Sequence, residues 1–305
     1  MRRNLAQLAL YRRNLDRWTV VYLVTSAFYP LLRPAVAPNL WAGILTHAGL
    51  ALAVWYLPPL MRRSRHVTLR LIGEIYLPFI FPLFYREMEY LGIVFLDFDA
   101  SFDPWFISLE ETLFGGQLSL VWSSAWPWPW FHELMEFAYF SYYLISLVVL
   151  ILIWRCRGIP DGQRWNALQA FVWDLGATML ICYSLYIFFP VWGPKYFQAG
   201  PVEVPGWIFT RIMEHIHVEG AILGAAFPSS HVAATLVPWW HVWKWFPQHR
   251  WWMTVLFGLL CAATVYCRYH YVVDVIGGLL LGSLILWAGG RHRETVRQVG
   301  NRNRC

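Results

Sequence analysis

The chain has 305 residues, of which 58% are hydrophobic and only 14% are charged. Soluble domains carry about 25% charged residues, so these figures exclude an ordinary soluble domain, and they equally exclude a disordered chain or a coiled coil. The net charge is +6, and the 20 Trp, 20 Phe and 16 Tyr fit a membrane protein with aromatic belts at both interfaces.

The basic residues and the cysteines give little support to other classes of protein. Lys and Arg stand in short clusters between apolar runs, and no basic-aromatic groove motif suggests nucleic-acid binding. The five cysteines are odd in number and form no CxxC pair, so they predict neither a disulfide framework nor a metal site. They are Cys156, Cys182, Cys261, Cys267 and Cys305.

A transmembrane helix needs roughly 20 apolar residues, and eight segments qualify. They are about 18–33, 40–60, 70–96, 133–154, 166–190, 228–246, 251–269 and 271–290. We therefore expect an all-α, polytopic helical membrane protein with about eight transmembrane helices. Long outer loops are expected at about 97–132, which contains the run Trp126-Pro127-Trp128-Pro129-Trp130, and at about 191–227.

The N-terminal segment has features of a cleavable signal, because basic residues and a short apolar run precede Ala35-Val36-Ala37. Arg33 and Pro34 interrupt that pattern, so we favour an uncleaved first span. Residues 1–17 could form a basic amphipathic helix on the membrane surface. We expect three parts: 1–69 with two additional spans, a membrane domain over 70–290, and a basic cytoplasmic tail over 291–305.

The distribution of basic residues predicts the orientation. Nineteen of the 24 Lys and Arg residues fall on one side if the N-terminus is cytoplasmic. The other five are Arg33, Arg86, Lys195, Arg211 and Arg268. Positive residues are enriched in cytoplasmic loops, so both ends are expected inside the cell and a polar site is expected to face outward.

The first segment that could carry chemistry is Pro228-Ser229-Ser230-His231. Pro228 suits the first position of a helix, which would put both serines in a first turn whose unpaired N–H groups attract an anion. His231 could supply a proton there. The alternative is a capped helix start with an incidental histidine.

The second is His270 with Asp274, four residues later, which would share one face of a helix. A carboxylate so placed can hold an imidazole in one tautomer, which makes a histidine nucleophile possible. Ionisable residues in spans are costly and are functional candidates by default, although a lone intramembrane ion pair remains the alternative.

Lys195 follows a span at the expected outer side and could hold a phosphate, or could simply extend to the interface. Lys195, His231, Arg268 and His270 all fall at outer membrane ends. Two histidines, a carboxylate and cations at one depth match the needs of phosphoryl transfer.

These motifs resemble the type 2 phosphatidic acid phosphatase superfamily, which also contains the vanadium haloperoxidases. The family pattern is Lys-x6-Arg-Pro, then Pro-Ser-Gly-His, then Ser-Arg-x5-His-x3-Asp, and the resemblance covers about residues 70–290. Here Ser230 replaces the motif glycine, while Val202 and Thr264 stand where arginines are expected. The compact His-Tyr-x-x-Asp segment more closely resembles the inositol phosphorylceramide synthase-like branch.

By this resemblance, His270 attacks phosphorus and forms a phosphohistidine, Asp274 orients it, and His231 protonates the leaving oxygen. Phosphate would be held by Ser229, Ser230 and Lys195, with Arg268 and Arg211 as candidates for the missing arginines. No metal and no cofactor is expected, because fixed cations neutralise the phosphate.

Three functions remain open: a lipid phosphatase, a lipid phosphotransferase that uses an alcohol as acceptor, and a non-catalytic transporter or phosphate-lipid binding protein. The expected partners are a phosphorylated lipid and the bilayer, with no nucleic acid. The expected location is a bacterial inner membrane, with the site on the non-cytoplasmic face. The tract Glu214-His215-Ile216-His217-Val218-Glu219 suggests metal binding only if it is a strand, whereas it is expected to be a surface helix.

Overall fold

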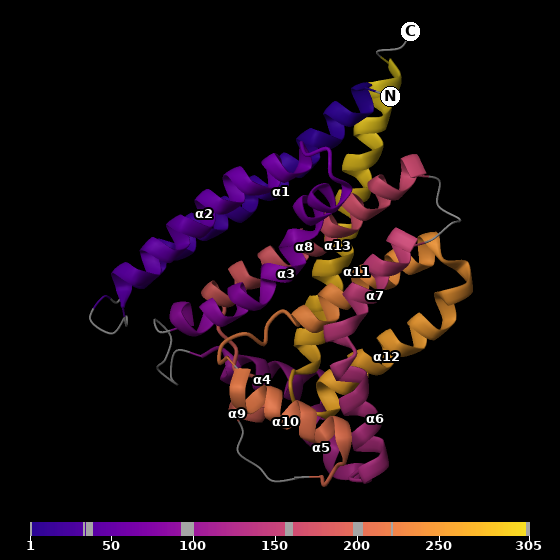
Figure 1. Ribbon diagram of the computed structural model, residues 1–305. Coiled ribbons are helices and arrows are strands. Elements are labelled where there is room, and N and C mark those ends of the chain that lie inside the picture. The colour runs from indigo at the N-terminus through magenta and orange to yellow at the C-terminus, as the bar shows by residue number, and fades with distance from the viewer. Residues whose placement is uncertain are drawn as a thin grey trace.

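The computed structural model describes residues 2–32, 34, 39–92, 101–155, 161–197, 204–220 and 222–302. These residues form helices joined by loops and turns (Figure 1). They contain no β-strand, only one isolated β-bridge between Val191 and Ala225. The expectation of an all-α fold is therefore confirmed for this part of the chain.

The N-terminal region is a helical hairpin of α1 (Arg2–Phe28) and α2 (Leu40–Arg62), followed by α3 (Val67–Leu91). No glycine or proline interrupts the chain before Pro30, so residues 2–17 form the first half of one long helix. They do not form a separate surface helix. A short 3-10 turn, Tyr29–Leu32, ends α1.

A buried polar network joins these three helices. The guanidinium of Arg62 on α2 donates to both carboxylate oxygens of Asp16 on α1, and the Tyr76 hydroxyl of α3 donates to Asp16 at 2.9 Å. Glu74 on α3 lies 3.7 Å from the same guanidinium. It also accepts a hydrogen bond from Gln169, which lies in the helix α8 (Asp161–Phe188). Because buried charges need partners, this network fixes the hairpin to the rest of the bundle.

The expected outer loop contains two short helices, α4 (Asp103–Phe114) and α5 (Leu118–Ala125), while residues 93–100 of that loop lie outside the described residues. The single span expected at 133–154 is α6 (Pro129–Phe140) and α7 (Tyr142–Arg155), which meet at a 49° bend. At the bend, the Ser141 hydroxyl donates to the Ala138 carbonyl at 2.6 Å. Such side-chain bonds to the helix backbone commonly bend helices.

The remaining elements are α8 (Asp161–Phe188), α9 (Pro194–Phe197), α10 (Ile208–Gly220), α11 (Ser230–Trp245), a 3-10 turn (Pro247–His249), α12 (Arg250–Tyr266) and α13 (Val272–Arg302). Helix α11 is central, with most of its residues buried among α7, α8, α12 and α13. Gly278 permits close approach of α13, since a Cβ there would lie 2.6 Å from the Ser229 carbonyl oxygen.

Four helices in the described residues are long and apolar enough to cross a membrane, or up to five if the bent pair α6–α7 is one span. They are Leu40–Arg62, Val67–Met88, Gln163–Phe188 and Val272–Arg291. Helices α11 and α12 have 16 and 17 residues. At 1.5 Å per residue they reach about 25 Å, short of the roughly 30 Å hydrocarbon core. The structure thus fits a membrane protein with several apolar spans, but the count of about eight is not confirmed.

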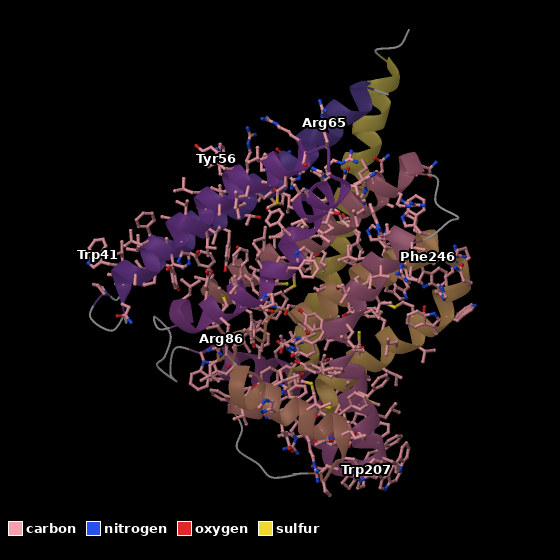
Figure 2. All side chains as sticks on the ribbon, in the orientation of Figure 1. Trp41, Tyr56, Arg65, Arg86, Trp207 and Phe246 are labelled. Atoms are coloured by element: carbon pink, nitrogen blue, oxygen red, sulfur yellow. The ribbon has the colours of Figure 1, made fainter. Side chains whose placement is uncertain are left out.

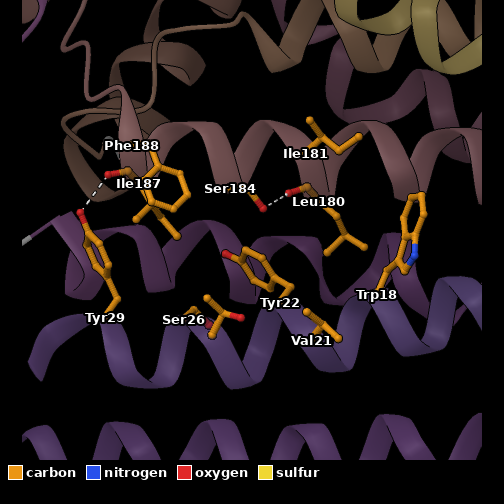
Figure 3. Close-up of a pocket in the computed structure, with 11 residues that line it drawn as sticks. Trp18, Val21, Tyr22, Ser26, Tyr29, Leu180, Ile181, Ser184, Ile187 and Phe188 are labelled. Carbon is orange, nitrogen blue, oxygen red and sulfur yellow. Dashed lines mark hydrogen bonds between the residues drawn. The ribbon is translucent and has the colours of Figure 1, made fainter.

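The first turn of α1 and the last turns of α13 lie at the same end of the bundle, and α4, α5, α9 and α10 gather at the other (Figure 1). Figure 2 shows Arg86 and Trp207 toward that second end, far from Arg65. A cavity of about 440 Å³ lies between α1 and α8 (Figure 3). Its walls are mostly apolar and include none of the candidate catalytic residues.

Candidate active site

The three sequence motifs are joined to one another by main-chain hydrogen bonds. The Ala226 N–H donates to the Val191 carbonyl at 2.9 Å, which ties the serine-histidine segment to the loop before Lys195. The Lys195 N–H donates to the Arg268 carbonyl at 2.9 Å, and the Ser229 N–H donates to the Asp274 carbonyl at 3.0 Å. Segments up to 80 residues apart along the chain therefore form one assembly at the end of the bundle.

The serine-histidine segment starts the central helix at Ser230, two positions later than expected. Ser229 is the N-cap of α11, and its hydroxyl accepts from the Val232 N–H, so Pro228 precedes the helix and does not occupy its first position. The physical reason is that a serine with extended backbone satisfies an orphan N–H group that proline cannot. The Ser230 N–H donates to the Tyr186 hydroxyl at 3.2 Å.

His270 and Asp274 lie together, but they do not share a helix face as expected. Helix α13 begins at Val272, and His270 lies in the preceding turn, where its N–H donates to the Thr264 carbonyl at 2.9 Å. The Asp274 carboxylate is fully buried, accepts from the Tyr271 N–H at 2.9 Å and lies 3.4 Å from His270 Nδ1. A carboxylate at Nδ1 leaves the Nε2 of His270 for reaction.

His231 is surrounded by aromatic rings. Its imidazole stacks on Tyr139 with ring centroids 4.5 Å apart and lies 4.3 Å from the Tyr142 ring. The Tyr139 hydroxyl is 3.4 Å from His231 Nδ1. The His231 and His270 ring centroids are 5.6 Å apart. The two histidines therefore have different surroundings: His270 lies next to a carboxylate, whereas His231 is enclosed by aromatic rings.

Lys195 lies beside this pair, on α9, with its ammonium 4.7 Å from the centroid of the Tyr269 ring. Burial lowers the pKa of Lys195, and the negative charge of Glu136 opposes that effect. The two candidate arginines are placed differently. The Nε of Arg268 donates to the Ser123 hydroxyl of α5 at 2.8 Å, and Arg211 lies exposed on α10.

Two buried carboxylates organise the loops of the site, and the sequence analysis did not single them out. Asp103 accepts from the N–H groups of Trp192 and Gly193 at 2.7 and 2.9 Å, and from the Tyr271 hydroxyl at 2.9 Å. Glu110 accepts from the Val272 N–H at the start of α13, and burial raises its pKa. Their spacing from the motifs gives no signal, because both lie over 80 residues earlier in the chain.

A cavity of about 350 Å³ opens next to His231. It is lined by Pro78, Phe81, Pro82, Tyr85, Arg86, Tyr139, Tyr142, Tyr143, Ser146, Leu175, Met179, Tyr183, Ile216, His217, Gly220, Ser230, His231 and Ala234. The walls are thus rich in tyrosine and include two histidines and one arginine. Arg86 lines this cavity, whereas Glu87 lies 3.5 Å from His47 of α2.

His217 is a site candidate that the sequence did not identify. The tract containing it is the helix α10, as expected, so His215 is exposed while His217 turns inward. Its Nδ1 lies 2.6 Å from the Met213 carbonyl, so this nitrogen must carry the proton. Burial lowers the pKa of His217 to about 3, and the nearby charge of Lys195 adds to the effect. His217 therefore presents a neutral imidazole to the cavity.

One group of side chains has the composition of a metal site. Ligand atoms of His132, Glu136 and Cys267 lie within 4.8 Å of one another. However, both Glu136 oxygens already accept from the Tyr269 hydroxyl, each at 3.0 Å, and the Lys195 ammonium acts on the same carboxylate. A fixed ammonium disfavours a second cation in the same space, so we assign this group to the lysine.

Two other acidic residues, Glu133 and Asp174, connect helices. Glu133 accepts from the N–H groups of Trp207 and Ile208 and caps the start of α10. Asp174 on α8 lies 2.9 Å from His241 of α11 and accepts from Arg293 of α13 at 2.8 Å. Both carboxylates connect helices and contact none of the motif residues.

Two comparisons with known proteins found a match for this chain. Residues 104–288, from α4 to α13, match the sequence profile described as the PAP2 superfamily. A "PA-phosphatase related-family protein" of Dictyostelium discoideum is 26% identical over 178 residues, which is 52% of this chain. The match spans only about a third of that relative (32%), and no solved structure matches this chain significantly. Because the profile covers more than half of the chain, the protein belongs to the PAP2 superfamily, a family of phosphatases and phosphotransferases.

Proposed function

We propose that this protein is a membrane-embedded, metal-independent lipid phosphatase. It hydrolyses a phosphorylated or diphosphorylated lipid at the outer face through a phosphohistidine intermediate. The observation that carries the proposal is the meeting of His231, His270 and Asp274 in one main-chain-bonded assembly beside Lys195. Family membership supports phosphoryl transfer as the reaction type.

In the first step, His270 Nε2 attacks phosphorus, and the bond from phosphorus to the lipid oxygen breaks. Asp274 holds the ring through Nδ1 and stabilises its charge. His231 gives a proton to the leaving oxygen. The tyrosine rings around His231 supply no negative charge, so the incoming phosphate supplies the charge that favours its protonated form.

In the second step, His231 takes a proton from a water molecule, which attacks phosphorus and breaks the bond to His270. Lys195 neutralises phosphate charge, and Ser229 and Ser230 mark the N-terminus of α11, where the positive end of the helix dipole favours an anion. Arg268 and Arg211 are the least supported members of this set, because one is bonded to Ser123 and the other is exposed.

The direct test is release of phosphate from lipid phosphates by the purified protein with EDTA present. We expect release by the wild type and loss of it in His270→Gln and His231→Gln. His215→Gln is a matched control, because His215 is exposed on α10 away from the pair. Equal phosphate release by His270→Gln and the wild type would refute the phosphohistidine mechanism. No turnover by the wild type, with water or an added alcohol as acceptor, would leave a transport or binding role. A requirement for added metal would refute metal independence.

A lipid phosphotransferase, similar to inositol phosphorylceramide synthase, is the second candidate, and the cavity next to His231 favours it. A volume of about 350 Å³ is roughly ten times the space that one water molecule occupies. Such a cavity has room for an alcohol acceptor in the second step. Turnover that appears only with an added alcohol such as inositol would favour this candidate over hydrolysis.

We propose that the protein is a multi-pass protein of a bacterial inner membrane, with this site on the non-cytoplasmic face. The charge distribution of the sequence supports this orientation, with 19 of 24 basic residues on the opposite side. The test is a cysteine placed at Arg211, an exposed position on α10, and labelled in intact cells with a membrane-impermeant maleimide. Protection of that cysteine until the cells are opened would contradict the orientation.

A further inference from the structure

Tyr269, which adjoins the proposed nucleophile His270, is a hub of aromatic contacts. Its ring stacks on His217, with centroids 4.3 Å apart and planes 8° apart, and lies 4.3 Å from the Tyr139 ring. Tyr139 in turn stacks on His231. Tyr269 is buried, so its position affects the lysine, the cavity histidine and, through Tyr139, the proposed acid.

A single carboxylate fixes this hub. Glu136 on α6 is 4% exposed, and both of its oxygens accept from the Tyr269 hydroxyl at 3.0 Å. His132, one helical turn earlier, lies 3.5 Å from the same carboxylate. A charge buried to this degree in a span is costly, which calls for a compensating partner. The Lys195 ammonium, which lies over the Tyr269 ring, interacts electrostatically with this carboxylate and is one such partner.

We propose that Glu136 is a positioning residue that keeps Lys195 charged and, through the Tyr269 hydroxyl, holds the Tyr269 ring beneath the ammonium. The carboxylate touches no substrate and acts through these two residues. This inference rests on the proposed function, because Lys195 is there the cation that binds phosphate.

The groups around Lys195 support a dominant role for Glu136. Burial lowers the pKa of the ammonium, and Glu136 is the largest influence that raises it, ahead of Cys267 and Glu214. His132 and His217 also face the ammonium, and its charge lowers the pKa of His217. Removal of the Glu136 charge would therefore leave only the smaller influences of Cys267 and Glu214 to oppose burial.

The chain offers a direct measurement, because Lys195 and Lys244 are its only lysines. Reductive methylation with ¹³C-formaldehyde labels both in the purified full-length protein, and NMR then follows each titration separately. We expect Glu136→Gln, which can still accept from Tyr269, to lower the pKa of Lys195. Glu214→Gln should lower it less, since Glu214 is exposed, and Lys244, in the last turn of α11, should not change.

Activity provides a second and independent readout. In Glu136→Gln, the alkaline fall of kcat/KM should move to lower pH, and in a Lys195→Arg background the same substitution should not move it. Tyr269→Phe keeps the ring but loses the hydroxyl, and kcat/KM should fall between about 10-fold and 100-fold because the lysine is misplaced. Tyr266→Phe is the matched control, since it loses a hydroxyl bond to the Trp126 carbonyl away from Lys195.

The outcomes separate the two proposals. An unchanged Lys195 titration in Glu136→Gln would overturn the positioning role whether or not the protein is an enzyme. An alkaline shift that persists in the Lys195→Arg background would also overturn it, because an arginine does not titrate in that range. Wild-type protein that hydrolyses no lipid phosphate would overturn the proposed function, while the NMR titration would still decide the role of Glu136.

Discussion

Replacement of Asp103 by alanine removes the acceptor that holds the loop before Lys195. Four donors lose their partner: the N–H groups of Trp192 and Gly193 and the hydroxyls of Ser101 and Tyr271. A buried donor left unsatisfied costs about 1–3 kcal/mol, so we expect Asp103→Ala to lower the free energy of unfolding by about 3–5 kcal/mol. Asp103→Asn keeps one acceptor oxygen and should cost about half as much.

The assay is thermal unfolding of the detergent-purified protein, in which this loss lowers Tm by about 10 °C. The Glu111→Gln variant is the control, because Glu111 is exposed on the same helix, and its Tm should stay close to the wild-type value. Phosphate release, measured well below the Tm of every variant, should also fall in Asp103→Ala, since Tyr271 follows His270 directly. If Asp103→Ala and Glu111→Gln have the same Tm, the buried carboxylate does not organise the site and the reasoning fails.

Three further predictions concern the residues around the two histidines. Asp274→Asn should lower kcat by about 10³-fold to 10⁴-fold with little change in KM, because the wrong tautomer of His270 is then favoured; an unchanged kcat in steady-state assays would contradict the assigned role. Tyr139→Phe keeps the stack on His231 but loses the hydroxyl near Nδ1. We therefore expect kcat to fall while the Tm stays at the wild-type value. A fall in Tm with an unchanged kcat would indicate that the hydroxyl is purely structural. His217→Gln should raise KM without moving the acid side of the pH–rate profile, because a histidine with a pKa of about 3 stays neutral above pH 3. A shifted acid side would show that His217 titrates in the pH range in which the enzyme is active.

Local patterns in the sequence predicted the helices but not how they are interrupted. Apolar runs located each long helix, because a span must satisfy its backbone internally. The bend at Ser141 and the short lengths of α11 and α12 were not predicted, since composition does not show where a helix bends or ends inside an apolar run. The helices α4 and α5 were missed because they lie in a region expected to be a loop.

For the candidate site, the sequence analysis supplied residues whose chemistry is local in the motifs. His231, His270 and Asp274 could be named from spacing, although the helix face assumed for the last two was wrong. Three further residues could not be predicted, because their roles depend on contacts between α6, α10 and the turn before α13, and sequence spacing does not reveal such contacts. They are Glu136, His217 and Tyr269. An isolated Glu in an apolar span, as at 136, was the one available signal.

The buried network of Asp16, Arg62 and Glu74 bears on how the protein can be dissected. Because α3 shares those charges with the N-terminal hairpin, a truncated protein that starts at residue 70 would leave Glu74 and the Tyr76 hydroxyl facing lipid without the guanidinium. A shortened version of this protein that keeps α3 must therefore retain the hairpin or replace Glu74 with a neutral residue.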